Sequence, residues 1–230
     1  MNKRTDPKSF WENKILTWEN GRYKEKESSS SMLENIANKS SNSLRFRLEI
    51  TKVLLKDHII GKSVFEIGCG SGMLAKDLVY MGARQYVGYD FAASAIEKAK
   101  LVAQEQNITD KASFFEASVL DLPDLEADVV FSLGLVDWLD DDEIAHLFKV
   151  GQQAHFLHAF SEKRFSVSQM IHRLYVFVSY GHKTNGYQPR YQTTQELADI
   201  ANKYNNHEAK VYRNPQLSFG ALFTSLPIVS

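Results

Sequence analysis

The sequence predicts an α/β fold: a doubly wound, mostly parallel seven-stranded sheet with a C-terminal antiparallel hairpin and an N-terminal helical cap. Two observations carry this prediction. Between residues 62 and 160, short apolar runs alternate with segments of helical periodicity, which is typical of a parallel sheet covered by helices on both faces. Near the C-terminus, two apolar runs are separated by the turn signal Asn214-Pro215, a gap too short for a crossover helix.

The composition is that of an ordinary globular chain. Of 230 residues, 43% are apolar and 24% are charged, and the length favours one domain. Lys and Arg number 27 against 28 Asp and Glu, a net charge of −1, which argues against a nucleic-acid partner bound by bulk positive charge. Cys69 is the single cysteine, so an intramolecular disulfide and a Cys-rich zinc site are excluded.

The sequence contains no recognisable targeting or membrane signal. Its first residues, MNKRTDPKSFWENK, lack the apolar core of a secretory signal. No uncharged apolar stretch reaches the roughly 18 residues that a spanning helix needs. We therefore expect a cytoplasmic protein without stable membrane insertion.

Residues 1–43 differ from the rest and are predicted to form a cap segment, with the main domain over 44–230. They are polar and serine-rich, yet they contain Phe10, Trp11 and Trp18, which is unusual for a disordered tail. Helices are predicted over 8–20, 31–38 and 44–58, with a mobile stretch at 21–31. Ser43 is the expected N-cap of the third helix.

The alternating elements of the main domain follow in order. Strands are predicted at 63–67, 85–89, 112–116, 128–133 and 154–160. Helices are predicted between and after them at 73–81, 93–105, 140–150, 166–179 and 193–204. The closing hairpin is predicted from the runs 207–213 and 217–226. In such sheets, ligands bind beyond the carboxyl ends of the parallel strands.

The first strand runs into a glycine loop at Gly68, Gly70 and Gly72, and a helix follows. Glycine allows a positive φ and lets a ligand approach the backbone, and the start of the helix offers free N–H groups. Asp90 closes the second strand, twenty residues after Gly70. A carboxylate at that place can accept hydrogen bonds from both hydroxyls of an adenosine ribose.

The spacing of the loop discriminates between two cofactor classes. A dinucleotide-binding G-x-G-x-x-G pattern fails, because Met73 stands where the third glycine should be. The observed E-x-G-x-G-x-G resembles motif I of the class I S-adenosylmethionine-dependent methyltransferases, and the resemblance covers about residues 60–160. It implies a Rossmann-like methyltransferase fold with S-adenosylmethionine as the cofactor.

The resemblance also implies roles for particular residues. Glu66 helps to hold the amino end of the methionine moiety, and the loop Gly68, Cys69, Gly70, Ser71 and Gly72 lies under the cofactor. Asp90 binds the ribose hydroxyls and Phe91 lies against the adenine. The remaining contacts that the resemblance implies are Ser118 and Val119 at the adenine edge and Ser132 and Leu133 on the methyl-donor side. Arg45 and Arg47, at the entry to the domain, are candidates for the cofactor carboxylate and could instead be surface charges.

Methyl transfer from a sulfonium mainly requires alignment of donor and acceptor, and a base is needed only if the acceptor must lose a proton. The candidates are Asp137, which could instead help to cap the next helix, and His158, which could instead be a core histidine. Trp138 could face the sulfonium or pack on the sheet. The acidic run 140–143 is interpreted as a helix cap rather than a metal site, so no metal is predicted.

The acceptor side is expected at an insertion over residues 161–191, which is rich in basic and aromatic residues. By the resemblance, this insertion and the N-terminal helices form the lid over a small-molecule acceptor, which is expected to be anionic, ring-bearing, or linked to a sugar or lipid. The run Val176-Phe177-Val178 could touch a membrane surface. The exit of the fourth strand lacks the Asn/Asp-Pro-Pro-Tyr/Phe pattern of enzymes that methylate amino groups of DNA bases and glutamines.

The sequence therefore predicts an S-adenosylmethionine-dependent methyltransferase that acts on a small molecule, with oxygen slightly favoured as the methylated atom. Two alternatives stay open at this point. One is a nicotinamide-dependent oxidoreductase on a similar sheet. The other is a non-catalytic module that binds S-adenosylmethionine without a usable acceptor site.

Overall fold

The computed structural model describes residues 6–23, 32–164, 169–170, 173–174, 177, 184 and 187–227. Most of the helix predicted over 166–179 and most of the stretch predicted over 21–31 lie outside these residues.

A seven-stranded sheet forms the centre of the fold, in the order β3-β2-β1-β4-β5-β7-β6. The strands are β1 (Ser63–Ile67), β2 (Gln85–Asp90), β3 (Ala112–Glu116), β4 (Val129–Ser132), β5 (His155–Ser161), β6 (Lys210–Tyr212) and β7 (Gly220–Thr224). The pairs among β1 to β5 are parallel, and β7 runs antiparallel to both β5 and β6. The predicted fold class, including the C-terminal antiparallel pair, is confirmed.

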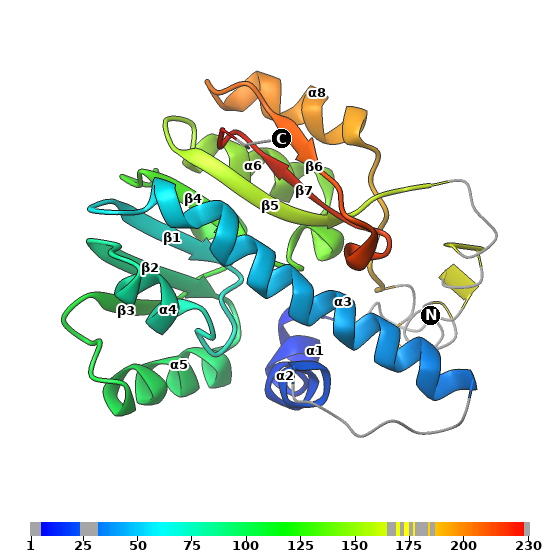
Figure 1. The fold of residues 1–230 in the computed structure, drawn as a ribbon, viewed down its shortest axis with the longest axis horizontal. Coiled ribbons are helices and arrows are strands. Elements are labelled where there is room, and N and C mark those ends of the chain that lie inside the picture. Colours follow the sequence, from blue (N-terminus) through cyan, green and yellow to red (C-terminus); the bar gives the residue numbers. More distant parts are fainter. Residues whose placement is uncertain are drawn as a thin grey trace.

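Helices cover both faces of this sheet, as a doubly wound fold requires (Figure 1). They include α3 (Met32–Leu55), α4 (Ala75–Tyr80), α5 (Ala93–Glu105), α6 (Asp141–Val150) and α8 (Thr194–Tyr204). Leu55, Leu78 and Ile96 place α3, α4 and α5 in one buried apolar cluster. Leu147 and Leu197 place α6 and α8 in a second cluster.

The acidic run before α6 caps that helix. Asp140 Oδ1 accepts a hydrogen bond from Glu143 N at 2.9 Å, and Glu143 Oε2 accepts one from Asp140 N at 2.8 Å. This reciprocal pair satisfies two N–H groups that the first helical turn leaves free. The interpretation of this run as a cap is confirmed.

The N-terminal segment differs from its prediction. The single helix expected over 8–20 is divided into α1 (Pro7–Glu12) and α2 (Ile15–Tyr23). The helices expected over 31–38 and 44–58 form one helix, α3, followed by a 3₁₀ turn, Lys56–His58. Ser43 lies inside α3, so the N-cap predicted there is wrong. Serine and asparagine lower helix propensity by only a fraction of a kcal/mol, about 0.5, and the packing of the helix on the sheet outweighs this cost.

Helix α3 crosses the predicted boundary between residues 43 and 44, and α1 and α2 lie beside it (Figure 1). The cap is therefore joined to the main domain by a continuous helix rather than by a loop. Among the described residues, no helix combines the length and apolar character needed to cross a membrane.

Candidate active site

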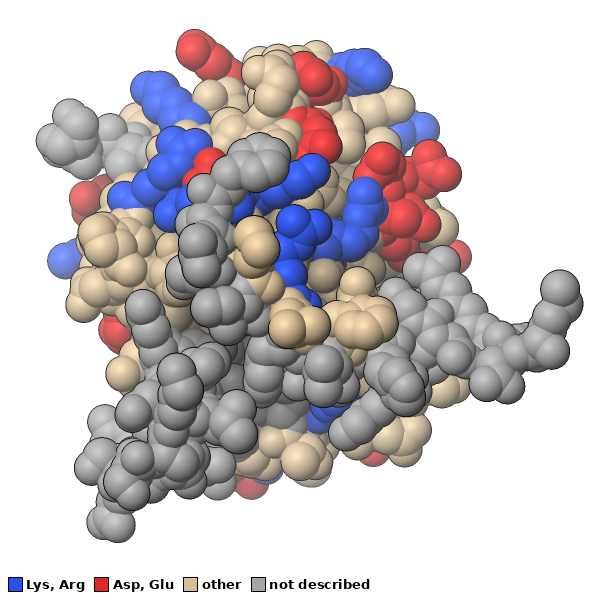
Figure 2. Space-filling view, turned by 90° about the vertical axis from the view of Figure 1, so that its right-hand side faces the viewer, with Lys and Arg blue, Asp and Glu red and all other residues tan. Residues whose placement is uncertain are grey.

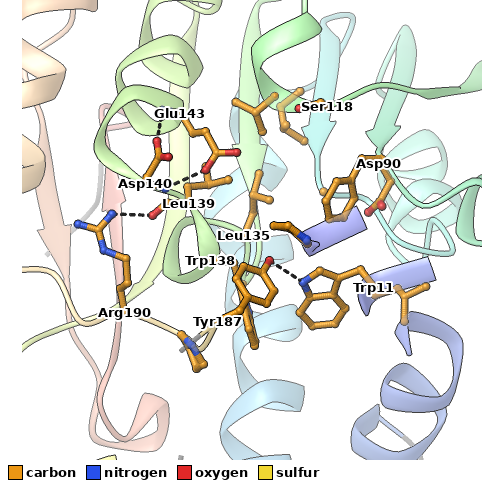
Figure 3. Close-up of a pocket in the computed structure, with 18 of the residues that line it drawn as sticks. Trp11, Asp90, Ser118, Leu135, Trp138, Leu139, Asp140, Glu143, Tyr187 and Arg190 are labelled. Atoms are coloured by element: carbon orange, nitrogen blue, oxygen red, sulfur yellow. Dashed lines mark hydrogen bonds between the residues drawn. The ribbon is translucent and has the colours of Figure 1, made fainter. Parts of the chain in front are cut away.

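A cavity of about 610 Å³ lies at the carboxyl ends of the parallel strands. Its lining includes Gly68 after β1, Asp90 at the end of β2 and Ser118 after β3. Figure 3 shows Asp90 toward one side of this cavity and Arg190 toward the other. This is the edge at which open α/β sheets bind ligands.

The glycine loop has the backbone conformation that the motif predicts. Gly68 has a φ of +74° and Gly70 a φ of +53°, values that side-chain-bearing residues rarely adopt. A Cβ atom on Gly68 would lie 3.2 Å from the Leu135 side chain, and one on Gly70 would collide with Glu19 Oε1. The loop therefore requires glycine both for its turn and for the close approach of other segments.

Asp90 is held rigidly beside this loop. Its Oδ2 accepts a hydrogen bond from Gly70 N and its Oδ1 one from Ala92 N, both at 2.9 Å. The residue is 8% exposed, and burial raises the pKa of its carboxyl group while the backbone hydrogen bonds lower it. The carboxylate is positioned at the cavity, as the predicted ribose contact requires.

Glu66 occupies a deeper place than its predicted contact with the methionine moiety implies. Its side chain is buried on β1, and Tyr86 Oη donates a hydrogen bond to Oε2 at 2.5 Å. Burial, with the nearby charges of Glu19 and Asp90, raises the pKa of Glu66 to about 8 despite that bond. Glu66 does not line the cavity.

The other predicted cofactor residues divide into two groups. Phe91, Ser118, Val119 and Leu133 line the cavity together with Gly68 and Asp90. The following residues do not line it: Cys69, Gly70, Ser71, Gly72, Ser132 and Arg45. Among these residues, Cys69 has a buried thiol. Arg45 donates a hydrogen bond to Asn42 within α3.

His158, the histidine predicted as a general base, does not line the cavity. Its imidazole is 2% exposed, and Nδ1 lies 2.9 Å from Ser132 Oγ. The ring stacks on Phe156, with centroids 5.6 Å apart, and burial lowers the pKa to about 3. A histidine in this environment is a neutral core residue, the alternative that the sequence left open.

Asp137 is likewise engaged away from the cavity. Its Oδ1 accepts a hydrogen bond from Ser161 N at 2.6 Å and its Oδ2 one from Ser161 Oγ at 2.8 Å. Burial raises the pKa of the carboxyl group, against these two bonds. The side chain thus fixes the end of β5 and does not line the cavity, and its role as a base or cofactor contact stays a prediction.

An aromatic cluster joins the N-terminal cap to the far side of the cavity (Figure 3). Trp11 Nε1 donates a hydrogen bond to Tyr187 Oη at 3.1 Å. The Trp138 ring lies 4.8 Å from that of Trp11 and 5.1 Å from that of Tyr187, measured between centroids. Trp138 therefore both packs against other rings and lines the cavity.

Two carboxylates of the cap contact the cofactor edge, and sequence reasoning missed them. Glu12 Oε1 accepts a hydrogen bond from Ser94 N at 2.9 Å, and Glu19 Oε1 accepts one from Ser71 N at 3.0 Å. In a polar segment, both residues look like ordinary surface charges. Their partners are 82 and 52 residues away, so no local pattern marks them.

Basic residues lie on the expected acceptor side. Arg173 and Arg190 line the cavity, and the Arg173 guanidinium lies 5.4 Å from the centre of the Tyr191 ring. Arg190 donates to Leu139 O at 2.8 Å and to Asp141 Oδ1 at 2.6 Å. Figure 2 shows Lys and Arg side chains gathered near the centre of one face. Of the run Val176-Phe177-Val178, only Phe177 is described, and its side chain is 52% exposed.

Within the described residues, no group of three His, Cys, Asp or Glu side chains is arranged to hold a metal ion. The capped acidic run before α6 and the engaged carboxyl groups of Glu66 and Asp137 agree with this finding.

Comparisons with known proteins relate part of the chain to methyltransferases. The family model described as a methyltransferase domain matches residues 64–153. A ribosomal protein L11 methyltransferase of Alteromonas mediterranea is 38% identical over 72 residues, 31% of this chain and 24% of that protein. That of Photobacterium profundum is 36% identical over 73 residues, with the same shares. The chain spans about a quarter of the length of these curated relatives.

Solved structures share the fold over nearly the whole chain. The magnesium protoporphyrin IX methyltransferase of Synechocystis PCC 6803, with bound S-adenosylhomocysteine, has a TM-score of 0.70 at 14% identity and covers 94% of this chain and 96% of its own. A possible exported protein of Bordetella parapertussis has a TM-score of 0.72 at 15% identity, with 93% and 79% covered. The methyltransferase-domain model thus matches the part of the chain that contains the glycine loop, and the solved structures share its fold.

Proposed function

We propose that the chain transfers a methyl group from S-adenosylmethionine to a small-molecule acceptor, with oxygen slightly favoured as the methylated atom. The observation that carries this proposal is the continuous cavity of about 610 Å³, which extends from Asp90 and Ser118 to Trp138, Tyr187 and Arg190. One cavity thus contains both a half expected to bind the cofactor and a second, aromatic and basic half expected to bind the acceptor.

The cofactor half fits the group that the family uses. Asp90 offers a fixed carboxylate for ribose hydroxyls, and Phe91, Ser118 and Val119 surround the place expected for adenine. Gly68 brings bare backbone to the same edge. When bound, S-adenosylmethionine supplies an electrophilic methyl group, which an acceptor lone pair attacks while the carbon–sulfur bond breaks and its electron pair stays on sulfur.

The acceptor half supports a ring-bearing, anionic molecule, including one linked to a sugar or lipid. Trp138, Tyr187 and Tyr191 offer aromatic surface, and the Arg173 guanidinium offers positive charge, whereas the Arg190 guanidinium is paired with Asp141. Such sites hold a ligand by apolar contact and orient it with a few polar groups. Residues 1–43 and 161–191 form the lid in this proposal, and 44–230 form the domain that it closes.

Alignment, rather than proton abstraction, is the main contribution of the chain in this proposal. His158 and Asp137 are held away from the cavity, and burial raises the pKa of Tyr191 to about 12. A group with that pKa is protonated at neutral pH and does not act as a base. Acceptors that are already deprotonated, such as carboxylates, need no base in the transfer.

The test is a turnover assay with methyl-labelled S-adenosylmethionine and a panel of carboxylic acids, phenols, amines and a ribosomal-protein acceptor. We expect labelled small molecules with matching release of S-adenosylhomocysteine, and better turnover of anionic acceptors than of their neutral amides. Arg173→Met should reduce that preference, whereas the exposed Lys98→Met on α5 should not. Label found only in protein would contradict the small-molecule proposal. Cofactor binding without turnover of any acceptor would support the non-catalytic alternative.

A further inference from the structure

The N-terminal cap inserts a carboxylate into the glycine loop. Glu19 on α2 accepts a hydrogen bond from Ser71 N at 3.0 Å, and the same oxygen occupies the space in which a side chain at Gly70 would lie. Gly70 thus does more than permit a turn. Its missing side chain makes room for a carboxylate from α2 of the cap.

A second carboxylate seats the same cap on the neighbouring helix. Glu12 Oε1 accepts a hydrogen bond from Ser94 N at 2.9 Å, and Ser94 Oγ donates to Glu12 O at 3.1 Å. Ser94 lies in the first turn of α5, the helix that follows Asp90 and Phe91. The cap therefore contacts the backbone after β1 and after β2, the two strand ends that frame the cofactor half of the cavity.

Negative charge accumulates around this loop. Burial raises the pKa of Glu19, the bonds from Ser71 lower it, and the charge of Asp90 raises it. Glu19 and Asp90 also help to raise the pKa of Glu66 to about 8, so Glu66 is mostly protonated at neutral pH and the negative charge comes from Glu19 and Asp90. In the part of the chain that the structure describes, no Lys or Arg forms a salt bridge with any of these three residues.

Like charges gathered at a partly buried site repel one another and attract a cation. The methyl donor of this family is such a cation, because its sulfonium carries a positive charge. The product of transfer has lost that charge, while its adenosyl and amino-acid groups are unchanged. The two ligands therefore differ mainly in the property to which an acidic loop responds.

We propose that Glu19, which does not itself line the cavity, determines cofactor specificity through the charge that it places behind the glycine loop, so that the cap favours the positively charged methyl donor over its net-neutral demethylated product. This inference rests on the proposed function, since it assumes that the cavity takes this cofactor. It gives the cap a role on the cofactor side in addition to the lid over the acceptor. Loss of the sulfonium charge on transfer weakens the hold of the cap and so favours product release.

Calorimetric binding to the full chain tests the proposal without turnover. The ligands are S-adenosylmethionine, sinefungin, which keeps a positive charge in place of the sulfonium, and S-adenosylhomocysteine. Glu19→Gln retains an oxygen for Ser71 N but removes the charge. We expect it to weaken both cationic ligands about tenfold, equal to about 1.4 kcal/mol, and to change S-adenosylhomocysteine binding much less.

Two matched variants complete the experiment. Glu97→Gln makes the same charge change on the exposed face of α5 and should leave all three affinities unchanged. Glu19→Asp keeps the charge and should retain most of the preference, and circular dichroism verifies that each variant folds. Should Glu19→Gln fail to fold, Glu19→Asp still decides: loss of the preference in this charged variant overturns the proposal.

The outcomes distinguish a failure of the inference about Glu19 from a failure of the proposed function. If Glu19→Gln weakens the binding of all three ligands equally, Glu19 only holds the cap in place, and the inference is overturned. Tighter binding of all three would show that Glu19 obstructs the loop, and would overturn it as well. If the unaltered chain binds none of the ligands, the proposed function itself fails.

Discussion

His158 offers a sharp test of the distinction between a core histidine and a catalytic one. In the folded state the pKa of its imidazole is about 3, whereas the ordinary pKa of a histidine, expected in the unfolded chain, is 6.5. Between these values only the unfolded state binds the proton. The free energy of unfolding must then fall as the pH is lowered from 6.5 toward 3.

The magnitude follows from the linkage of proton binding to folding. Each pH unit in that window contributes about 1.36 kcal/mol, so lowering the pH from 7 to 5 removes about 2 kcal/mol of stability through this residue alone. Glu66 acts in the opposite sense: its raised pKa of about 8 gives stability that is complete below 4.5 and lost as the pH rises through 8. The contribution of the imidazole is therefore isolated only by comparing the pH dependence of the free energy of unfolding between the variant and the unaltered chain.

The assay is urea unfolding of the unaltered chain and of His158→Gln at pH 7 and pH 5. Glutamine does not titrate, so the loss of stability between the two pH values should be about 2 kcal/mol smaller in the variant. His155→Gln at the start of the same strand is the comparison variant for a partly exposed histidine; burial and the charge of His207 also lower the pKa of His155, so this variant should reduce the pH dependence in the same direction but by less than His158→Gln. An equal pH dependence in His158→Gln and the unaltered chain would show that the imidazole titrates normally and would reopen its role as a base.

Three further predictions follow from the site and its supports. Asp90→Asn should weaken cofactor binding by about 1–3 kcal/mol in calorimetry, because an amide cannot accept both backbone hydrogen bonds and still serve the ribose; unchanged affinity would contradict the ribose assignment. Glu162→Gln should lower the free energy of unfolding by about 2 kcal/mol at neutral pH, since Arg213 donates to this carboxylate and lowers its pKa to about 2. That stabilisation is complete above 4.5 and lost as the pH falls through 2, so a deficit that persists near pH 2 would argue against the ion pair. Trp11→Phe and Tyr187→Phe should each cost about 1 kcal/mol in urea unfolding and should not be additive, and additive losses would show that the bond between them contributes nothing.

The parts of the fold that local sequence determines were predictable. The helix over 93–105 and the strand over 112–116 have the predicted limits, because their apolar spacing and flanking turns lie within a few residues of one another. The glycine loop was predictable for a similar reason: positive φ and a following helix are read from adjacent residues. Gly68 and Asp90 could therefore be assigned to one edge of the sheet from the sequence alone.

The parts that depend on distant contacts were not predictable. The side chains of Glu19 and Tyr187 owe their places to partners 52 and 176 residues away, and nothing nearby distinguishes them from surface or core residues. The face to which a strand residue points does not determine its depth, which is why His158 could be placed on β5 but not identified as buried. Helix α3 continues through Ser43 because tertiary packing outweighs a weak local preference for a cap.

These long-range contacts give the cap its functional meaning. One end of the cap holds the cofactor edge through Glu19 and Ser71, and the same pair of helices reaches Tyr187, on the acceptor half, through Trp11. A ligand that changes the position of the cap at one contact must change the free energy of the other, and this linkage is reciprocal. Binding of the methyl donor should thus favour the aromatic arrangement that the acceptor meets, and an acceptor that packs on this arrangement should in turn hold the donor more tightly. In the proposed function, the acidic loop and the aromatic cluster are thus two contacts of one element, the N-terminal cap.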